Sequence, residues 1–163
     1  MSLEEFNALP ADQARSRVTG CLDVPRWVEA VVAGRPYAAR EDLLAVAAEA
    51  GRRLDDDELA RALSRHPRIG ERADPRRHDA TDSAKEQAGV DREDAEVVRR
   101  LADGNRAYEE RFDRVFLIRA AGRDAPEILA ELHRRLGNDD ETERRETVDQ
   151  LVQIALLRLE RMV

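Results

Sequence analysis

The sequence predicts an all-α protein, a single-domain bundle of about eight helices that spans residues 1–163. Three observations lead to this prediction. Apolar residues recur at spacings of three and four along most of the chain, as on one face of a helix. Prolines, glycines and helix-capping residues separate these periodic segments. Candidate strands for a parallel sheet are missing, and 163 residues is an ordinary length for one domain.

The first half of the chain is expected to form five helices, each with a recognisable start or end. Ser2 and Glu5 have the spacing of a capping box at the start of the first helix. Asp55 or Asp56 can cap the fifth through its side-chain oxygen. The expected helices cover residues 2–10, 11–22, 25–34, 40–54 and 55–65.

Residues 67–82 have a different character. The segment holds two prolines, a glycine and many charged residues, and it lacks apolar periodicity. We therefore expect a loop of about sixteen residues, a length that is usually functional or disordered within a compact domain.

Helical periodicity returns in the second half, at residues 82–89, 91–112, 124–136 and 140–162. The apolar run Val115–Ile118 is too short for periodicity to distinguish a strand-like segment from a helical turn. The helix 91–112 is expected to bury the stripe Ala95, Val98, Ala102, Asn105, Tyr108 and Phe112. The last helix is expected to bury Val148, Leu151, Val152, Ala155, Leu159 and Met162.

Composition and charge exclude several classes of function. The net charge of −7 argues against a dedicated nucleic-acid-binding module, which usually carries a basic stripe. No apolar stretch approaches the length needed to cross a bilayer, and the N-terminus carries acids where a secretory signal would carry bases. We therefore expect a soluble cytoplasmic protein that binds neither nucleic acid nor a membrane.

Metal binding is not expected from this sequence. The single Cys21 excludes an internal disulfide framework and a cysteine-based zinc cluster. The three histidines, His66, His78 and His133, do not share a helical face, and no metal-binding motif joins them. His133 is expected on an exposed helix face and His78 in solvent.

His66 occupies a more useful position. It ends a predicted helix and precedes Pro67, which biases it out of the helical conformation and aims the imidazole off the end of a rigid element. The partial negative charge at the helix C-terminus would favour an imidazolium. An ordinary helix-end histidine remains the alternative interpretation.

A second candidate lies in the segment Ser83–Gln87. Ser83, Glu86 and Gln87 fall on adjacent faces of one helical turn, close to a helix start whose amides can meet an anion. A simple capping box formed by Ser83 and Glu86 would give the same pattern.

Two further features fit either a binding site or the core. The apolar run Phe116, Leu117, Ile118, Arg119 and Ala120 is consistent with a buried core segment or with a pocket wall whose backbone amides face a ligand. Arg158, inside a strongly apolar helix, can extend its charge to solvent or hold a substrate carboxylate bidentately.

These weak signals occur in an order that resembles a known family. The motifs are HPRIGE at 66–71, SAKEQAGV at 83–90, NRAYEERF at 105–112, FLIRAAGR at 116–123, EILAELHRRLGN at 127–138 and IALLRLERM at 154–162. Together they resemble the OHCU decarboxylases, which convert 2-oxo-4-hydroxy-4-carboxy-5-ureidoimidazoline to (S)-allantoin in urate catabolism. The resemblance covers essentially the whole chain and implies an all-α, cofactor-free enzyme that is commonly a homodimer.

The resemblance also implies roles for particular residues. His66 corresponds to the catalytic histidine, Pro67 to an adjacent substrate contact, and Glu86 and Arg158 to further site positions. The remaining implied substrate contacts are Ser83, Ala84, Lys85, Glu86, Gln87, Phe116, Leu117, Ile118, Arg119 and Ala120. Two departures concern the loop after the histidine, which reads Pro-Arg-Ile-Gly-Glu, and Arg119, where a small or neutral residue is common.

This chemistry needs neither pyridoxal nor a metal, because the imidazoline ring of the substrate can accept the electron pair that CO₂ leaves behind. We expect His66 and Glu86 to hold the 4-hydroxyl and to control protonation. Main-chain amides of Phe116–Ala120, with Gln87, would bind the ring carbonyl and the ureido group. Two alternatives stay open: a helical adaptor or regulatory domain, and a decarboxylase or lyase for a related ureido compound.

Overall fold

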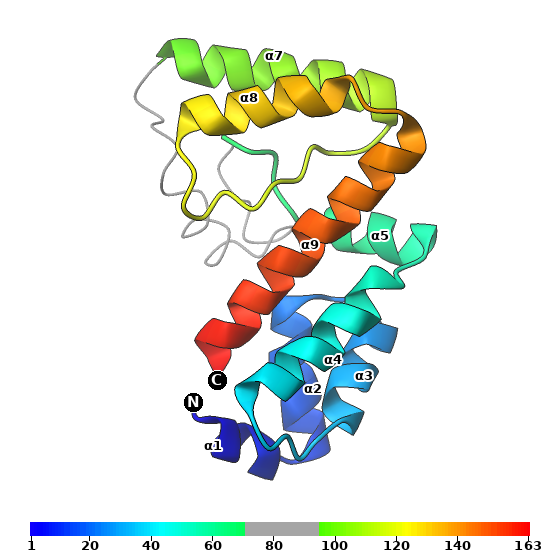
Figure 1. Cartoon of the computed structure of the whole chain (residues 1–163), viewed down its shortest axis with the longest axis vertical. Helices are drawn as coiled ribbons and strands as arrows, with labels where there is room; N and C mark the ends of the chain where they lie inside the picture. The colour runs from blue at the N-terminus through cyan, green and yellow to red at the C-terminus, as the bar shows by residue number, and fades with distance from the viewer. Residues whose placement is uncertain (71–94) are drawn as a thin grey trace. The chain divides into compact units, whose positions relative to one another are not determined.

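The computed structural model describes residues 1–70 and 95–163. In these two ranges the chain forms eight helices and no strand, which confirms the predicted all-α class (Figure 1). The helices are α1 (Leu3–Ala8), α2 (Ala11–Cys21), α3 (Pro25–Ala33), α4 (Arg40–Arg52), α5 (Asp56–Leu63), α7 (Ala95–Phe112), α8 (Ala125–Leu136) and α9 (Asp140–Met162). The helix predicted at 82–89, most of the loop predicted at 67–82 and the candidate segment Ser83–Gln87 lie outside the described residues.

The chain forms two compact units. Met1–Ala62 and Val152–Val163 make unit 1, and Leu63–Leu151 makes unit 2. Helix α9 runs through both, with residues up to Leu151 in unit 2 and the rest in unit 1. The prediction of one domain over residues 1–163 therefore stays a prediction.

The capping signals read from the sequence act as expected. The Ser2 side chain accepts a hydrogen bond from the Glu5 amide at 3.2 Å, and the Glu5 carboxylate accepts one from the Ser2 amide at 2.7 Å. Asp55, rather than Asp56, caps α5, because its Oδ1 accepts from the Glu58 amide at 2.8 Å. These reciprocal contacts satisfy amides that have no partner within the helix.

Unit 1 is built around α2, α3 and α4, with α3 packed against both of the other helices. Trp27 on α3 is 1% exposed, and its indole N–H donates to the Ala47 carbonyl at 2.8 Å. Gly51 on α4 leaves room for Val152, because a Cβ at position 51 would lie only 2.7 Å from Val152 Cγ2. The indole therefore packs in the core with its one polar atom satisfied.

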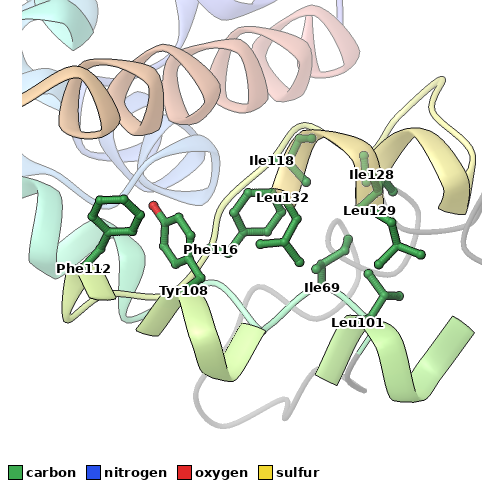
Figure 2. Packing of buried hydrophobic residues seen from close by; sticks show 10 residues of the cluster. Ile69, Leu101, Tyr108, Phe112, Phe116, Ile118, Ile128, Leu129 and Leu132 are labelled. Carbon is green, nitrogen blue, oxygen red and sulfur yellow. The ribbon is translucent and has the colours of Figure 1, made fainter. Parts of the chain in front are cut away.

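In unit 2, α7 packs against α8 around a cluster of buried apolar side chains (Figure 2). The cluster consists of Ile69, Leu101, Tyr108, Phe112, Phe116, Ile118, Ala120, Ile128, Leu129 and Leu132. The Tyr108 ring meets those of Phe112 and Phe116 at centroid distances of 4.8 and 5.2 Å. Such tilted and edge-to-face contacts favour aromatic pairs beyond the area they bury.

The predicted buried stripe of α7 is correct at its C-terminal end and wrong at its N-terminal end. Asn105, Tyr108 and Phe112 are buried, whereas Ala95, Val98 and Ala102 are exposed. The buried face instead continues through Gly104 and Leu101. A Cβ on Gly104 would lie 2.3 Å from Leu132 Cδ2, so the missing side chain lets α8 approach α7 at this position.

The chain from α7 to α8 contains neither helix nor strand at residues 115–120, so neither structure considered for Val115–Ile118 forms there. Asp113 follows α7 with a φ of 52°, in the left-handed region. Asp124 then caps α8, where the Glu127 amide donates to its Oδ1 at 2.9 Å. Phe116–Ala120 is therefore part of an irregular segment between two defined helix ends.

Within the described ranges, no helix is both long and apolar enough to cross a membrane.

Candidate functional site

His66 lies in the turn that follows α5, not in the helix itself. Its amide donates to the Leu63 carbonyl at 3.0 Å, and Pro67 comes next. The His66 residue is 7% exposed and Pro67 is buried. The fold therefore holds this histidine against protein, in unit 2, and the helix predicted to reach Arg65 ends at Leu63.

The three residues after Pro67 are tied to α7. The Arg68 guanidinium pairs with the Glu109 carboxylate through two hydrogen bonds, one of them from Nη2 to Oε2 at 2.8 Å. Asn105 Nδ2 donates to the Ile69 carbonyl at 3.1 Å. Gly70 then adopts a φ of 87°, which an L side chain rarely tolerates. The beginning of the predicted loop is thus fixed.

A cavity of about 360 Å³ lies between this stretch and the exposed side of α7. Arg68, Gly70, Val98 and Ala102 are among the described residues that line it. Asn105 also lines it, and its Oδ1 is buried with no hydrogen-bond partner. Val98 and Ala102 are apolar although they do not belong to the core, and the cavity accounts for this because both residues line it.

Ser83, Ala84, Lys85, Glu86 and Gln87, the predicted partners of His66, lie outside the described residues. Their predicted roles stay predictions. Among the described residues, no group of three or more His, Cys, Asp or Glu side chains could hold a metal ion.

The segment Phe116–Ala120 contributes its side chains to the core. Phe116, Ile118 and Ala120 belong to the unit 2 cluster, and Leu117 is 4% exposed (Figure 2). Its main chain is partly occupied as well: the Leu117 carbonyl accepts from Arg135 Nη1 at 2.7 Å, and the Arg119 amide donates to Gln150 Oε1 at 2.9 Å. The Arg119 amide therefore already has an acceptor within the protein, and the predicted role of the main-chain amides of this segment in binding a ligand stays a prediction.

Two arginines of this region have an unsatisfied nitrogen. Arg119 Nε and Arg123 Nε are buried, with no hydrogen-bond partner. The Arg119 residue as a whole is half-buried.

Arg158 does not extend its charge to solvent, so that interpretation is wrong. The residue is 4% exposed, and its Nη1 donates to the Cys21 carbonyl at 3.5 Å. Both residues belong to unit 1, whereas His66 and Phe116–Ala120 belong to unit 2.

Sequence reasoning missed a buried polar network in unit 2. Arg135 and Glu143 are 1% and 0% exposed, and the Glu143 Oε1 accepts from Arg135 Nε at 2.9 Å and Nη2 at 2.5 Å. The same oxygen accepts from the Tyr108 hydroxyl at 2.5 Å, and Glu143 Oε2 accepts from Asn138 Nδ2 at 2.9 Å. Burial and these carboxylate contacts raise the pKa of Tyr108 to about 12. The one available signal was a charged residue at a core-facing helical spacing, Arg135 three residues after Leu132.

A family model described as OHCU decarboxylase matches residues 7–160 of the chain. The chain belongs to the OHCU decarboxylase family. The family predicted from the sequence motifs is thereby confirmed, and so is the class of enzyme, a carboxy-lyase of urate degradation.

Curated relatives carry matching names. The chain is 33% identical to the 2-oxo-4-hydroxy-4-carboxy-5-ureidoimidazoline decarboxylase of Amia calva, over 100% of this chain and 95% of the relative. It is 27% identical to the decarboxylase of the same name from Haloferax volcanii, over 98% and 94%. It is also 24% identical to the uric acid degradation bifunctional protein of Bacillus sp. TB-90, of which it spans 32%.

Two solved structures share the fold. An OHCU decarboxylase crystallised in the presence of (S)-allantoin superposes with a TM-score of 0.71 at 21% identity, covering 88% of this chain and 94% of that one. An (S)-allantoin synthase gives a TM-score of 0.75 at 17% identity, covering 100% of this chain and 54% of that one.

Proposed function

We propose that this OHCU decarboxylase family member converts 2-oxo-4-hydroxy-4-carboxy-5-ureidoimidazoline to (S)-allantoin and CO₂ without a cofactor. The family match over residues 7–160 is the observation that carries the proposal. It also favours an enzyme over the helical adaptor considered above. His66 is buried next to Pro67, and the stretch that directly follows, from Arg68, lines a cavity, which is consistent with a site for a small molecule in this part of the chain.

The reaction breaks the bond between C4 and its carboxylate. CO₂ leaves, and its electron pair forms a C4=C5 double bond while the ring nitrogen of the former C5=N bond takes up the displaced pair and a proton. A proton then adds to C5, the carbon that bears the ureido group, as the 4-hydroxyl loses its proton to become the ring carbonyl, which gives one enantiomer of allantoin. In our proposal His66 and Glu86 bind the 4-hydroxyl and turn the carboxylate out of the ring plane, where the breaking bond aligns with the ring π system. The protein thus supplies orientation and a stereospecific proton, which are typical contributions of a cofactor-free site.

The other predicted contacts are assigned to substrate positioning. Pro67 and the segment Ser83–Gln87 would surround the ring, and main-chain groups of Phe116–Ala120 would bind the ring carbonyl and ureido group. Arg158 would neutralise ground-state charge, although holding the leaving carboxylate too tightly would slow the reaction. We also propose a cytoplasmic homodimer. Light scattering coupled to size exclusion would test the dimer.

The activity test uses the unstable substrate made in place. Urate is converted by the two preceding enzymes of the route, this protein is added, and the circular dichroism of (S)-allantoin is followed. We expect formation of (S)-allantoin to be faster than spontaneous decay. No acceleration would contradict the proposed function, and acceleration with another ureido compound alone would identify a different substrate.

The role of His66 can be tested by substitution. His66→Ala should lower kcat about 10²–10⁴-fold, the usual contribution of a general acid or base, while the helical circular dichroism is kept. His133→Ala is the matched control, because His133 is exposed on α8 and should leave kcat unchanged. Near-normal turnover of the folded His66→Ala variant would remove this histidine from the mechanism.

A further inference from the structure

The irregular segment Phe116–Ala120 is held by side chains from two helices. On one side, Arg135 of α8 donates from Nη1 to the Leu117 carbonyl at 2.7 Å. On the other, Gln150 of α9 accepts from the Arg119 amide at 2.9 Å. These two contacts take the place of the backbone partners that a helix or a sheet would supply. Together they determine how the peptide groups on either side of Ile118 are oriented.

Arg135 is itself held rigidly. Two of its nitrogens contact Glu143 Oε1, at 2.9 and 2.5 Å, and Nη2 also lies 3.3 Å from Thr147 Oγ1. Its guanidinium carbon lies 4.7 Å from the centre of the Phe116 ring. A buried charge is tolerated only when it is paired and hydrogen-bonded, so this guanidinium has one well-defined position.

This arrangement does more than fill a core. Apolar residues of similar volume often replace a buried ion pair with no loss of stability, so the pair by itself is a weak source of stability. What apolar residues cannot do is direct a donor at the Leu117 carbonyl. The guanidinium is also rigid and planar, which makes it well suited to fix a peptide group.

We propose that Arg135 and Gln150 are positioning residues for the main chain of Phe116–Ala120, the segment to which the proposed function assigns the ring carbonyl and ureido group of the substrate. The inference therefore rests on that proposed function. Neither residue needs to contact the substrate. Their effect would be on substrate affinity, because a displaced peptide group weakens binding in the ground state and the transition state alike.

The test compares three variants of the full-length protein. Gln150→Leu removes the acceptor of the Arg119 amide, and Gln150→Glu retains an acceptor at the same place. Gln153→Leu is the matched control, since Gln153 lies on the same helix and is exposed. One hydrogen bond contributes about 0.5–1.5 kcal/mol, which corresponds to about a two- to tenfold change in affinity.

We expect Gln150→Leu to raise KM about two- to tenfold, to change kcat less than twofold, and to weaken (S)-allantoin binding in calorimetry by the same factor as KM. Gln150→Glu and Gln153→Leu should stay near wild type. Hydrogen exchange at the Arg119 amide should be faster in Gln150→Leu only. Wild-type KM and wild-type (S)-allantoin affinity in a folded Gln150→Leu variant would overturn the inference.

Arg135→Lys and Arg134→Lys provide a second comparison. Both keep the positive charge, but Arg134 is exposed and pairs with Glu131 and Glu146 at the surface. Arg135→Lys should raise KM more than tenfold, and Arg134→Lys should not change it. If Arg135→Lys does not fold, the Gln150 variants decide. A wild-type protein that does not accelerate substrate decay would overturn the proposed function itself, whereas an active wild type with unchanged variants would overturn only the positioning role.

Discussion

The Tyr108 hydroxyl illustrates how strongly one residue depends on its surroundings. It is 0% exposed and donates to Glu143 Oε1 at 2.5 Å. A phenolate there would be desolvated and would lie against a carboxylate, so the folded protein raises the pKa of Tyr108 to about 12. In the unfolded chain the pKa of tyrosine is about 10. Between these values the unfolded chain loses its proton first, and stability falls as the pH rises.

We therefore predict that Tyr108→Phe flattens the alkaline loss of stability. Between pH 10 and about 12, the free energy of unfolding of the wild type should fall more steeply than that of the variant, by up to about 1.4 kcal/mol per pH unit. Urea denaturation of both proteins at several pH values measures the two slopes. The slopes should coincide from pH 7 to 9, and equal slopes above pH 10 would contradict the prediction.

At this scale the sequence singles out some candidate residues and not others. It indicates His66 because a histidine at a helix end, followed by proline, has a recognisable local geometry, and the role of His66 stays a prediction. Arg135 has a weaker signal, its spacing of three residues after the core residue Leu132, and it stands next to Arg134 in the same helix. The tertiary structure separates the two arginines clearly: Arg135 is buried against Glu143, and Arg134 is exposed. Glu143 likewise resembles an ordinary acidic residue of a helix first turn.

The contact between α7 and α8 depends on a position without a side chain. Gly104 is buried on α7 and faces Leu132 of α8, which is 0% exposed. Helix propensity alone would favour alanine over glycine by about 1 kcal/mol. Packing opposes that preference, because an added Cβ would lie 2.3 Å from Leu132 Cδ2 and 3.2 Å from its Cγ. Leu132 is enclosed by the core and has little room to move.

We predict that Gly104→Ala destabilises the protein by about 1–3 kcal/mol, the usual cost of overpacking a core. Gly20→Ala in α2 is the matched control: nothing lies within 4 Å of the added Cβ, so it should stabilise by about 0.4–1 kcal/mol. Chemical denaturation of the two variants measures both changes. Stabilisation by Gly104→Ala would show that α8 shifts away without penalty.

Helices were predictable from the sequence wherever the stripe and the caps agreed. On α9 every residue of the expected stripe is buried except Met162, which is only half-buried. On α7 the small residues Ala95 and Ala102 suggested a buried stripe, but these two residues are exposed. Periodicity could not distinguish the side facing α8 from the side facing a cavity, since both carry apolar residues. The irregular segment at 115–120 was also beyond prediction, because its hydrogen-bond partners are side chains of α8 and α9.

At the scale of the molecule, the question is whether the two units unfold together. Helix α9 contributes to both, so melting one unit should remove packing from a helix that the other uses. The chain has one tryptophan, Trp27, and it lies in unit 1. Its fluorescence therefore reports on that unit alone. This gives a direct test of the single-domain prediction.

If the chain is one cooperative domain, the unit 2 variant Gly104→Ala should lower the urea midpoint seen by Trp27 fluorescence as much as the midpoint seen by far-ultraviolet circular dichroism. Independent units would leave the fluorescence midpoint at its wild-type value. A unit 1 change, Gly20→Ala, should shift the fluorescence midpoint in either case and serves as the control. Coincident transitions would support one domain over residues 1–163.

Fold class and family were predictable at this scale because both depend on the order of many segments rather than on any one residue. The helix predicted at 82–89 and most of the loop before it lie outside the described residues, so both remain predictions. The division into two compact units was not predicted, since no linker marks it in the sequence.

The left-handed backbone at Asp113 has a practical consequence for protein engineering. A residue with a Cβ is disfavoured in that conformation by about 1–2 kcal/mol relative to its ordinary one. The turn after α7 therefore contains strain that a more permissive residue would relieve. A library designed for a more stable enzyme could begin with substitutions of Asp113, which alter neither His66 nor the residues of the Arg135 network.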